Sequence, residues 1–342
     1  MTQKMVARSL NDILAAIPVT FGFHPEDSVV MLANGADKSG FQARVDLELT
    51  SEGRFGLANC LVEAAIQNDR NQLVLLFYTE DAELAEAHAR TCLEVSESMG
   101  LQVLCAVRVD DERYYPLRAI DPVLALREPQ GWPYDNAEHP FTLQAQYEGQ
   151  VIHASRAERA ALLTTFDSTA ARKLRRALRD LRVNREHGSL GLAEQGRWLQ
   201  QTLRDTIKCN GRLGITDAAR VIDLVSQIQF RDVAWLEIRQ REQAWLDLWL
   251  DLTQRSSLLE DADRVAPAAL LAFASWQVGD GALAWCAVEH CLSLDLEYHL
   301  AHLVADALVK AIPPGTWSPP DESLLTVFTD PCFANPSDAS AS

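Results

Sequence analysis

Residues 73–109 read LVLLFYTEDAELAEAHARTCLEVSESMGLQVLCAVRV and decide the fold class. They contain an almost wholly apolar run at Leu73–Tyr78, a segment of helical periodicity over 81–98 and a second apolar run at Leu101–Val109. Apolar runs of this length are typical of strands that are buried on both faces in parallel βαβ units. The stretch therefore predicts an α/β domain.

The alternation of strand and helix continues toward the N-terminus. Residues 54–67 are an amphipathic helical segment, and residues 28–33 are a short apolar run that follows a turn at 24–27. A helix is expected to begin at Ser9 and to end at Pro18, because an acceptor and an acid three residues apart are typical of a helix start.

Residues 43–49 alternate strictly between apolar and polar side chains, which predicts a half-buried strand. Ala43, Val45, Leu47 and Leu49 are expected to face the core, and Arg44, Asp46 and Glu48 the opposite face. We expect this strand to pair antiparallel with residues 28–33 at one side of the sheet. The domain as a whole is predicted to have three layers around a mixed, mostly parallel sheet.

The rear half of the chain has helical periodicity almost throughout. It predicts helices at about 156–166, 169–186, 192–208, 216–227, 231–253, 267–278, 282–293 and 297–311. We therefore divide the chain into an α/β domain over residues 1–122, a proline-rich connector over 123–154, an all-α domain over 155–312 and an acidic, proline-rich tail over 313–342.

One part of the helical half has the phase of a tetratricopeptide repeat. Over residues 268–296, Leu271 and Ala272 stand at its large and small positions, and Ala284 and Cys291 at its later small positions. An ordinary antiparallel helix pair explains the same spacing, because small residues also serve general helix packing. Tetratricopeptide-like helix pairs and a generic helix pair both remain open.

The charge and the cysteines of the chain limit its partners and its location. Lys and Arg number 31 against 48 Asp and Glu, a net charge of −17 that disfavours nucleic acid as a partner. The seven cysteines are scattered without a Cys-x-x-Cys pair, which is typical of a reducing compartment. No signal peptide and no apolar run of about 20 residues is seen. We expect a cytoplasmic protein with no membrane partner.

Several longer stretches resemble one known family. They are Leu14–Pro18, Gly22–Val30, Ala43–Leu47, Ala269–Trp285, Tyr298–Ala301 and Pro313-Pro314. Together they resemble the actinobacterial family known as domain of unknown function 4192. The chain departs from it at Leu296, where the family more often has proline, and at Ala311, where it more often has glycine. The resemblance implies an actinobacterial, cytoplasmic protein and the domain layout given above, but it implies no activity.

The turn at residues 22–28 and the polar face of strand 43–49 form the first candidate site. If the two strands pair, His24, Asp27, Arg44 and Asp46 could converge as a general base, an orienting acid and an anion clamp. The alternative is structural: Pro25 and Asp27 shape a tight turn, and Arg44 pairs with a neighbouring acid.

Two other groups of residues could hold a metal. Thr79-Glu80-Asp81 and Asp110-Asp111 follow two strands, and His290, Cys291, His299 and His302 lie on adjoining helices with Cys286 one turn earlier. Helix capping and ordinary packing explain these residues more simply, and no glycine-rich phosphate loop or standard zinc spacing is present. We predict no metal and no cofactor.

The helix that begins near residue 169 is unusually basic for an acidic chain. Between residues 156 and 186 there are nine bases and four acids. The helix carries Arg172, Lys173, Arg175, Arg176 and Arg179 around an apolar stripe. These bases form either a surface for an acidic partner or RNA, or a solvated helix face that pairs with acids of its own chain.

The sequence contains no catalytic motif such as Gly-x-Ser-x-Gly or His-Glu-x-x-His. We therefore expect a non-enzymatic protein-interaction or regulatory scaffold whose helical half binds a protein or peptide. The alternative is a small-molecule hydrolase or transferase that uses the 22–28 turn with Arg44 and Asp46. RNA binding through residues 172–185 is a third hypothesis, which the acidity of the chain disfavours.

Overall fold

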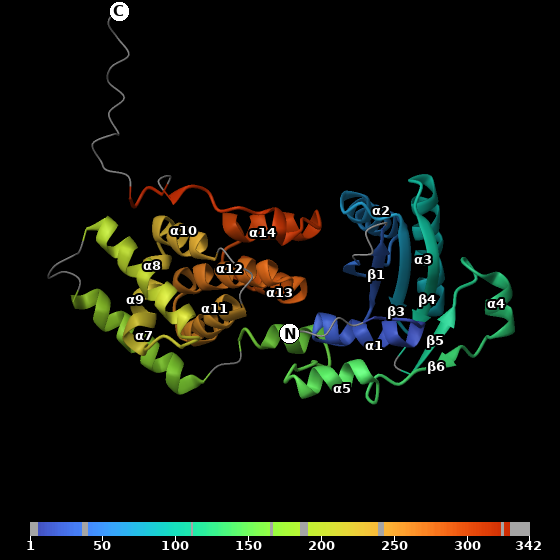
Figure 1. Cartoon of the computed structure of the whole chain (residues 1–342), viewed down its shortest axis with the longest axis horizontal. Helices are drawn as coiled ribbons and strands as arrows, with labels where there is room; N and C mark the ends of the chain where they lie inside the picture. Colours follow the sequence, from blue (N-terminus) through green and yellow to red (C-terminus); the bar gives the residue numbers. More distant parts are fainter. Residues whose placement is uncertain are drawn as a thin grey trace, which may run out of the picture. The chain divides into compact units, whose positions relative to one another are not determined.

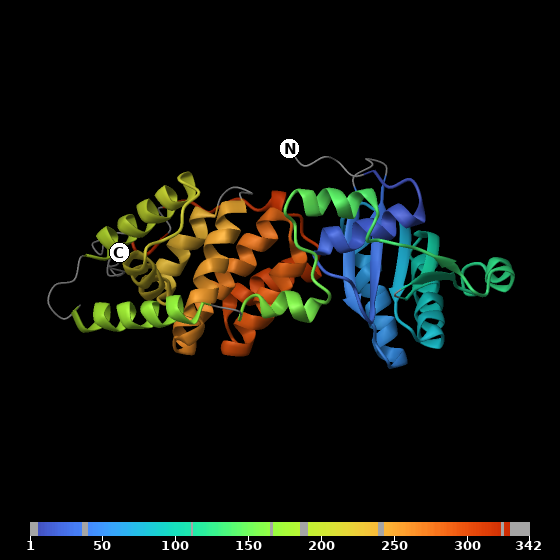
Figure 2. The same ribbon diagram turned by 90° about the horizontal axis from the view of Figure 1, so that it is seen from below.

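The computed structural model describes residues 6–35, 40–110, 112–164, 167–184, 191–238, 243–322 and 325–328. The chain divides into two compact units (Figures 1 and 2). The α/β unit comprises Met1–Arg159 with Ala307–Ile312, and the helical unit comprises Ala160–Asp306 with Pro313–Ser342. The connector predicted at 123–154 lies in the α/β unit, and the tail from 313 onward in the helical unit.

A single six-stranded sheet forms the centre of the α/β unit. Its strands lie in the order β2-β1-β3-β4-β5-β6. Their bounds are β1 Ser28–Asn34, β2 Phe41–Asp46, β3 Gln72–Tyr78, β4 Gln102–Val109, β5 Arg113–Pro116 and β6 Trp132–Pro133. Only β3 and β4 pair in parallel, and the other neighbouring strands are antiparallel. The prediction of a mostly parallel sheet is therefore wrong.

The position of β1 explains this error. The pairings make β2, β3 and β4 run in one direction, as expected when α2 (Ser51–Gln67) and α3 (Ala82–Ser98) connect them as crossovers. However, β1 lies antiparallel between β2 and β3. Local periodicity predicts the crossovers, but it does not reveal that an earlier strand separates the two strands that a crossover joins. The predicted antiparallel pair of β1 and β2 is confirmed, with β2 at the edge.

Helices cover both faces of the sheet. The side chains of β3 alternate: Leu73, Leu75 and Phe77 pack under α2 and α3, whereas Leu76 and Tyr78 face α1 (Leu10–Phe21) on the other side. Ala43 and Val45 of the edge strand, and Leu47 directly after it, pack against the α2–α3 layer as predicted. Leu49 does not, because β2 ends at Asp46 and leaves Leu49 80% exposed.

The segment after β5 completes the α/β unit. It contains α4 (Pro122–Arg127), β6 and α5 (Pro140–Tyr147), and α5 packs against α1. His139 lies at the start of α5, with Nε2 3.1 Å from the carboxylate of Asp12. His153 forms an isolated parallel bridge with Phe23. The contacts of α5 and His139 therefore hold this segment against α1.

The remaining helices are α6 (Arg156–Ala161), α7 (Ser168–Asn184), α8 (Leu192–Lys208), α9 (Ile215–Val225), α10 (Ile228–Glu237), α11 (Gln243–Arg255), α12 (Asp261–Val278), α13 (Gly281–Leu294) and α14 (His299–Val309). The single helix predicted at 231–253 is wrong, because α10 ends at Glu237. Since α10 packs mainly against α8 and α11 against α12, one straight helix could not bury both apolar faces.

His88 makes the stability of the α/β unit sensitive to pH. The side chain is buried in α3 with Nε2 2.9 Å from the carbonyl oxygen of Glu48, and burial lowers the pKa of His88. The unfolded chain takes up a proton near pH 6.5, whereas folded His88 stays neutral to lower pH. The free energy of unfolding should therefore be largest above pH 6.5 and fall as the pH is lowered below it.

Urea denaturation of the wild type and of His88→Gln between pH 7.5 and 5 tests this expectation. The variant should lose less stability over that interval than the wild type, because the group that titrates has been removed. Equal losses in the two proteins would show that His88 does not contribute.

Candidate functional site

The carboxyl ends of β2, β3 and β4 lie at the same edge of the sheet as the start of β1, and this edge holds the first predicted site. Arg44 Nη2 lies 2.7 Å from Asp46 Oδ1 and donates to the carbonyl oxygen of Glu26 at 3.2 Å. The guanidinium also lies 5.6 Å from the centre of the Phe23 ring. The structure thus brings Arg44 and Asp46 together, with the arginine bound to the turn.

The turn itself is held by backbone contacts. Asp27 has a left-handed φ of 38°, and its carbonyl oxygen accepts from the Leu47 N–H at 2.8 Å. Its carboxylate accepts from Thr79 Oγ1 at 3.4 Å. The exposed His24 donates its backbone N–H to the carbonyl oxygen of His153 at 3.1 Å. Asp27 therefore shapes the turn, as the structural alternative from the sequence expects.

The acids that follow β3 and β4, which the sequence offers as possible metal ligands, accept hydrogen bonds from nearby backbone N–H groups. Asp81 caps α3 by accepting from the N–H groups of Glu83 and Leu84. Asp110 accepts from the Arg113 N–H at 2.8 Å. Burial raises the pKa of Asp110, but hydrogen bonds from Tyr115, Arg113 and Glu112 bring it below its usual value. Asp111 lies outside the described residues.

The histidines and the cysteine near α13 and α14 do not converge on one point. Cys291 is buried with Sγ 3.5 Å from the carbonyl oxygen of Val265, and burial raises its pKa to about 12. A ring nitrogen of His299 lies near the carbonyl of Glu297, and one of His302 near that of Leu296. Among the described residues, no group of three or more His, Cys, Asp or Glu is placed to hold a metal ion.

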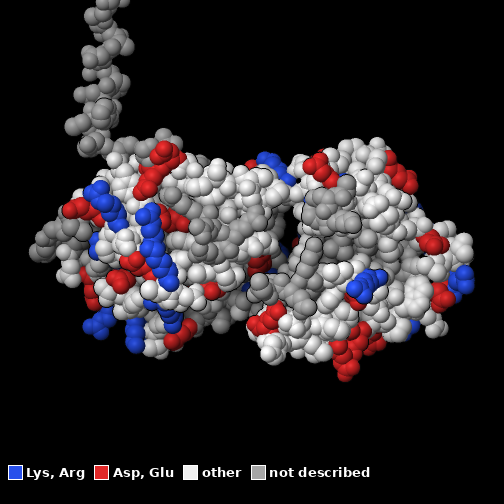
Figure 3. Space-filling view, in the orientation of Figure 1, with Lys and Arg blue, Asp and Glu red and all other residues white. Residues whose placement is uncertain are grey.

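The basic helix α7 has a different character. Its buried side consists of Ala171, Leu174 and Leu178. All five predicted bases are exposed: Arg172, Lys173, Arg175, Arg176 and Arg179. Figure 3 shows Lys and Arg side chains gathered at the left of the view, over the helices from α7 to α9. We call the five bases the α7 surface.

The structure also shows how few acids of the chain neutralise the α7 surface. Arg176 lies 3.7 Å from Asp180 in an exposed pair. Among the described residues, no carboxylate lies within 4 Å of Arg172, Arg175 or Arg179. An exposed pair on one helix contributes at most a few tenths of a kcal/mol, so it hardly reduces the attraction of this surface for an anion.

Arg182, one turn beyond the α7 surface, holds α7 in place. Its Nε donates to Asp223 of α9 at 2.9 Å, and its Nη1 and Nη2 donate to both carboxylate oxygens of Asp263 in α12 at 3.0 and 2.5 Å. Ser226 Oγ also donates to Asp263. The role of Arg182 could not be predicted from the sequence, because its two partners are distant in the chain.

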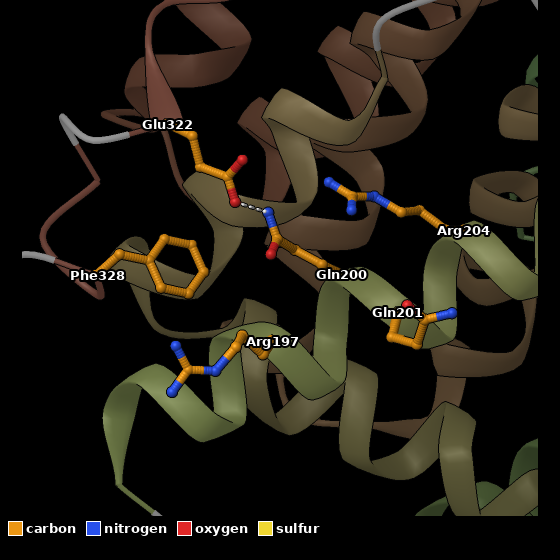
Figure 4. Close-up of a pocket in the computed structure, with 6 residues that line it drawn as sticks. All are labelled: Arg197, Gln200, Gln201, Arg204, Glu322 and Phe328. Atoms are coloured by element: carbon orange, nitrogen blue, oxygen red, sulfur yellow. Dashed lines mark hydrogen bonds between the residues drawn. The ribbon is translucent and has the colours of Figure 1, made fainter.

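A pocket of about 560 Å³ lies beside α8 in the helical unit. Figure 4 shows the six side chains that line it: Arg197, Gln200, Gln201 and Arg204 from α8, and Glu322 and Phe328 from the tail. Gln200 Nε2 donates to Glu322 Oε1 at 2.6 Å. Arg204 donates twice to the buried Glu237 of α10, and these hydrogen bonds raise its pKa.

This α8 pocket was not predicted from the sequence. Its walls come from α8 and from a tail more than 100 residues later, since Gln200 and Glu322 are 122 positions apart. The one local signal was Gly196, a glycine in the interior of a helix, which usually has a packing reason. Acids without bases in the tail were a second, weaker signal.

The family model described as "Domain of unknown function (DUF4192)" matches residues 11–315. The chain belongs to this family. The matched region of this DUF4192 chain includes both the sheet edge and the α7 surface, and it ends just before the tail residues that line the α8 pocket. No curated protein and no solved structure matches the chain. Within the described residues, no helix has the length and apolar character needed to cross a bilayer.

Proposed function

We propose that this DUF4192 chain is a non-enzymatic interaction protein whose helical unit binds an acidic segment of a partner protein through the α7 surface. The observation that supports this is a row of exposed bases with few internal partners on a chain of net charge −17. Arg172, Arg175 and Arg179 recur every three or four residues, so they share one side of α7 over about 10 Å.

An acidic peptide fits this surface better than a nucleic acid does. A long polyanion would meet the negative field of the whole chain as well as α7. A short acidic segment meets chiefly the local row of bases. The Arg182 contacts keep the helix fixed before binding, so little conformational freedom is lost on association.

Replacing Arg172, Arg175 and Arg179 with glutamine tests this proposal. Glutamine keeps the helix propensity, so the fold should be unaffected while three positive charges are lost. We expect a fluorescent glutamate-rich dodecapeptide to bind the wild type in a salt-dependent manner, and the variant at least about tenfold more weakly.

The matched control replaces Arg90, Arg118 and Arg127, three exposed bases of the α/β unit, with glutamine. It changes the net charge by the same amount and should leave peptide binding unchanged. Equal weakening in both triple variants would mean that only the overall charge matters. If the wild type bound a single-stranded RNA of matched length more tightly than the peptide, the partner class would be RNA and not an acidic protein segment.

Two further inferences accompany this proposal, one on helix pairing and one on location. We infer that α12 and α13 pair as in a tetratricopeptide repeat; the small residues Ala272, Ala284 and Cys291 are buried between helices, which supports this. We also place the protein in the cytoplasm, which the buried free thiols of Cys92 and Cys291 support. The α/β unit would then act as a scaffold or ligand sensor.

The alternative function has weaker support. A hydrolase or transferase at the 22–28 turn would need Arg44 to hold a substrate anion. Asp46 and the carbonyl oxygen of Glu26 already bind that guanidinium. A substrate would have to displace both, at a cost in binding free energy.

A further inference from the structure

The C-terminal tail packs onto the helical unit through side chains. The Trp317 ring lies 5.0 Å from that of Phe273 and 6.1 Å from that of Trp235, measured between ring centres. Further along, Leu325 and Val327 are buried. With the hydrogen bond between Gln200 and Glu322, this gives an aromatic, an acidic and an apolar anchor in one short segment.

Val327 and Phe328, which form the apolar anchor, pack against Gly196 of α8. We call this contact surface on α8 the seat of the tail. A Cβ at Gly196 would lie 2.6 Å from Val327 Cγ1 and 2.9 Å from Phe328 Cε1. Even an alanine could therefore be accommodated only if the side chains of Val327 and Phe328 shift, and we expect this to loosen the tail. Glycine is unfavourable in a helix interior, so its presence here is explained by the tail that lies against it.

Two backbone hydrogen bonds in the described part of the tail are internal to the tail. The Leu325 N–H donates to the carbonyl oxygen of Glu322 at 3.1 Å, and the Phe328 N–H to that of Leu325 at 2.9 Å. Pro319 and Pro320 have no N–H to donate. The segment can therefore leave its seat without breaking these hydrogen bonds or those within α8.

The surroundings of the seat suit an acidic segment. Arg197 lines the α8 pocket beside Glu322, together with Arg204, which Glu237 already pairs. The tail from 313 onward carries four acids and no bases. A cavity of about 560 Å³ lies between these α8 side chains and the tail residues Glu322 and Phe328.

We propose that α8, together with Trp235 of α10 and Phe273 of α12, forms a second peptide-binding site. It is specific for a segment with a tryptophan, an acid and an apolar-aromatic pair spaced as in residues 317–328. The chain's own tail occupies this site and competes with a partner segment of the same chemistry. The residues of this site are different from those of the α7 surface. Peptide binding at either place can therefore be disproved without affecting the proposal for the other. The family match ends at residue 315, so the occupant follows the shared region whereas α8 belongs to it.

Two single substitutions in the full-length chain should each release the tail, but they should have opposite effects on the binding of an added peptide. Val327→Asp damages the tail and leaves the seat open, whereas Gly196→Ala blocks the seat. A labelled peptide of residues 317–328 should bind the Val327→Asp variant at least about tenfold more tightly than the wild type, because the competing tail no longer fills the site. It should not bind the Gly196→Ala variant.

Matched controls exist for both substitutions. Ser318→Asp adds the same charge at an exposed position of the tail and should bind peptide like the wild type. Gly56→Ala in α2 adds a Cβ that meets nothing within 4 Å and should slightly raise the melting temperature without affecting the tail. A folded Val327→Asp variant that fails to bind the peptide, or a Gly196→Ala variant that binds it equally well, would overturn the proposal.

Hydrogen exchange of the wild type gives a test that needs no variant. The amides of Leu325 and Phe328 should exchange much faster than those in the middle of α8, because the tail opens locally. Equal protection would make the tail a permanent part of the core and overturn the proposal. A concentration-dependent dimer that Gly196→Ala abolishes would also overturn it, because a second copy's tail would then fill the seat.

Discussion

Replacing Phe77 with alanine should lower the free energy of unfolding of the α/β unit by about 3–5 kcal/mol. Phe77 lies on β3, between β1 and β4, and its side chain is 0% exposed under α2 and α3. Strands on both sides and helices above keep the neighbourhood from collapsing into the cavity. Truncation therefore loses both the burial of the ring and the contacts of the surrounding atoms.

Leu104→Ala on the neighbouring strand is the matched control, because Leu104 is exposed. It should cost less than about 1 kcal/mol. Urea unfolding followed by circular dichroism, with hydrogen exchange of the β3 amides, measures both variants. Similar losses for the two would contradict the central position of Phe77.

Removing the side chain of Arg182 should have the second largest effect. The Arg182 side chain is 44% exposed, but the side chains of Asp223 and Asp263 that it joins are only 3% and 6% exposed. Arg182→Met removes the guanidinium that both buried carboxylates bind. A loss of about 3 kcal/mol is expected for the helical unit, at the lower end of values for broken buried pairs because water already reaches the arginine.

Tryptophan fluorescence during urea denaturation can follow this loss, since every tryptophan except Trp132 lies in the helical unit. The exposed Arg176→Met should change stability by less than about 0.5 kcal/mol. Adding Asp263→Asn to Arg182→Met should recover part of the loss, because one buried charge is removed. If the double variant were less stable than Arg182→Met, the loss would not come from uncompensated charge.

Part of the candidate surface could be read from the sequence because it is local. Five bases on one helix around an apolar stripe predict exposed bases, and the structure places Arg172, Arg175 and Arg179 in solvent. The Arg44–Asp46 pair was likewise foreseen, because two residues separated by one position lie on the same face of a strand. The α8 pocket was not foreseen, because its two walls are far apart in the chain.

The sequence by itself determined which segments are strands and which are helices over most of the chain, since side-chain periodicity reports local burial. Only the tertiary structure decided the order of the strands, the break between α10 and α11, and the seat of the tail against Gly196. The physical reason is the same in each case. Apolar periodicity records that a face is covered, but the element that covers it is chosen by packing between distant parts of the chain.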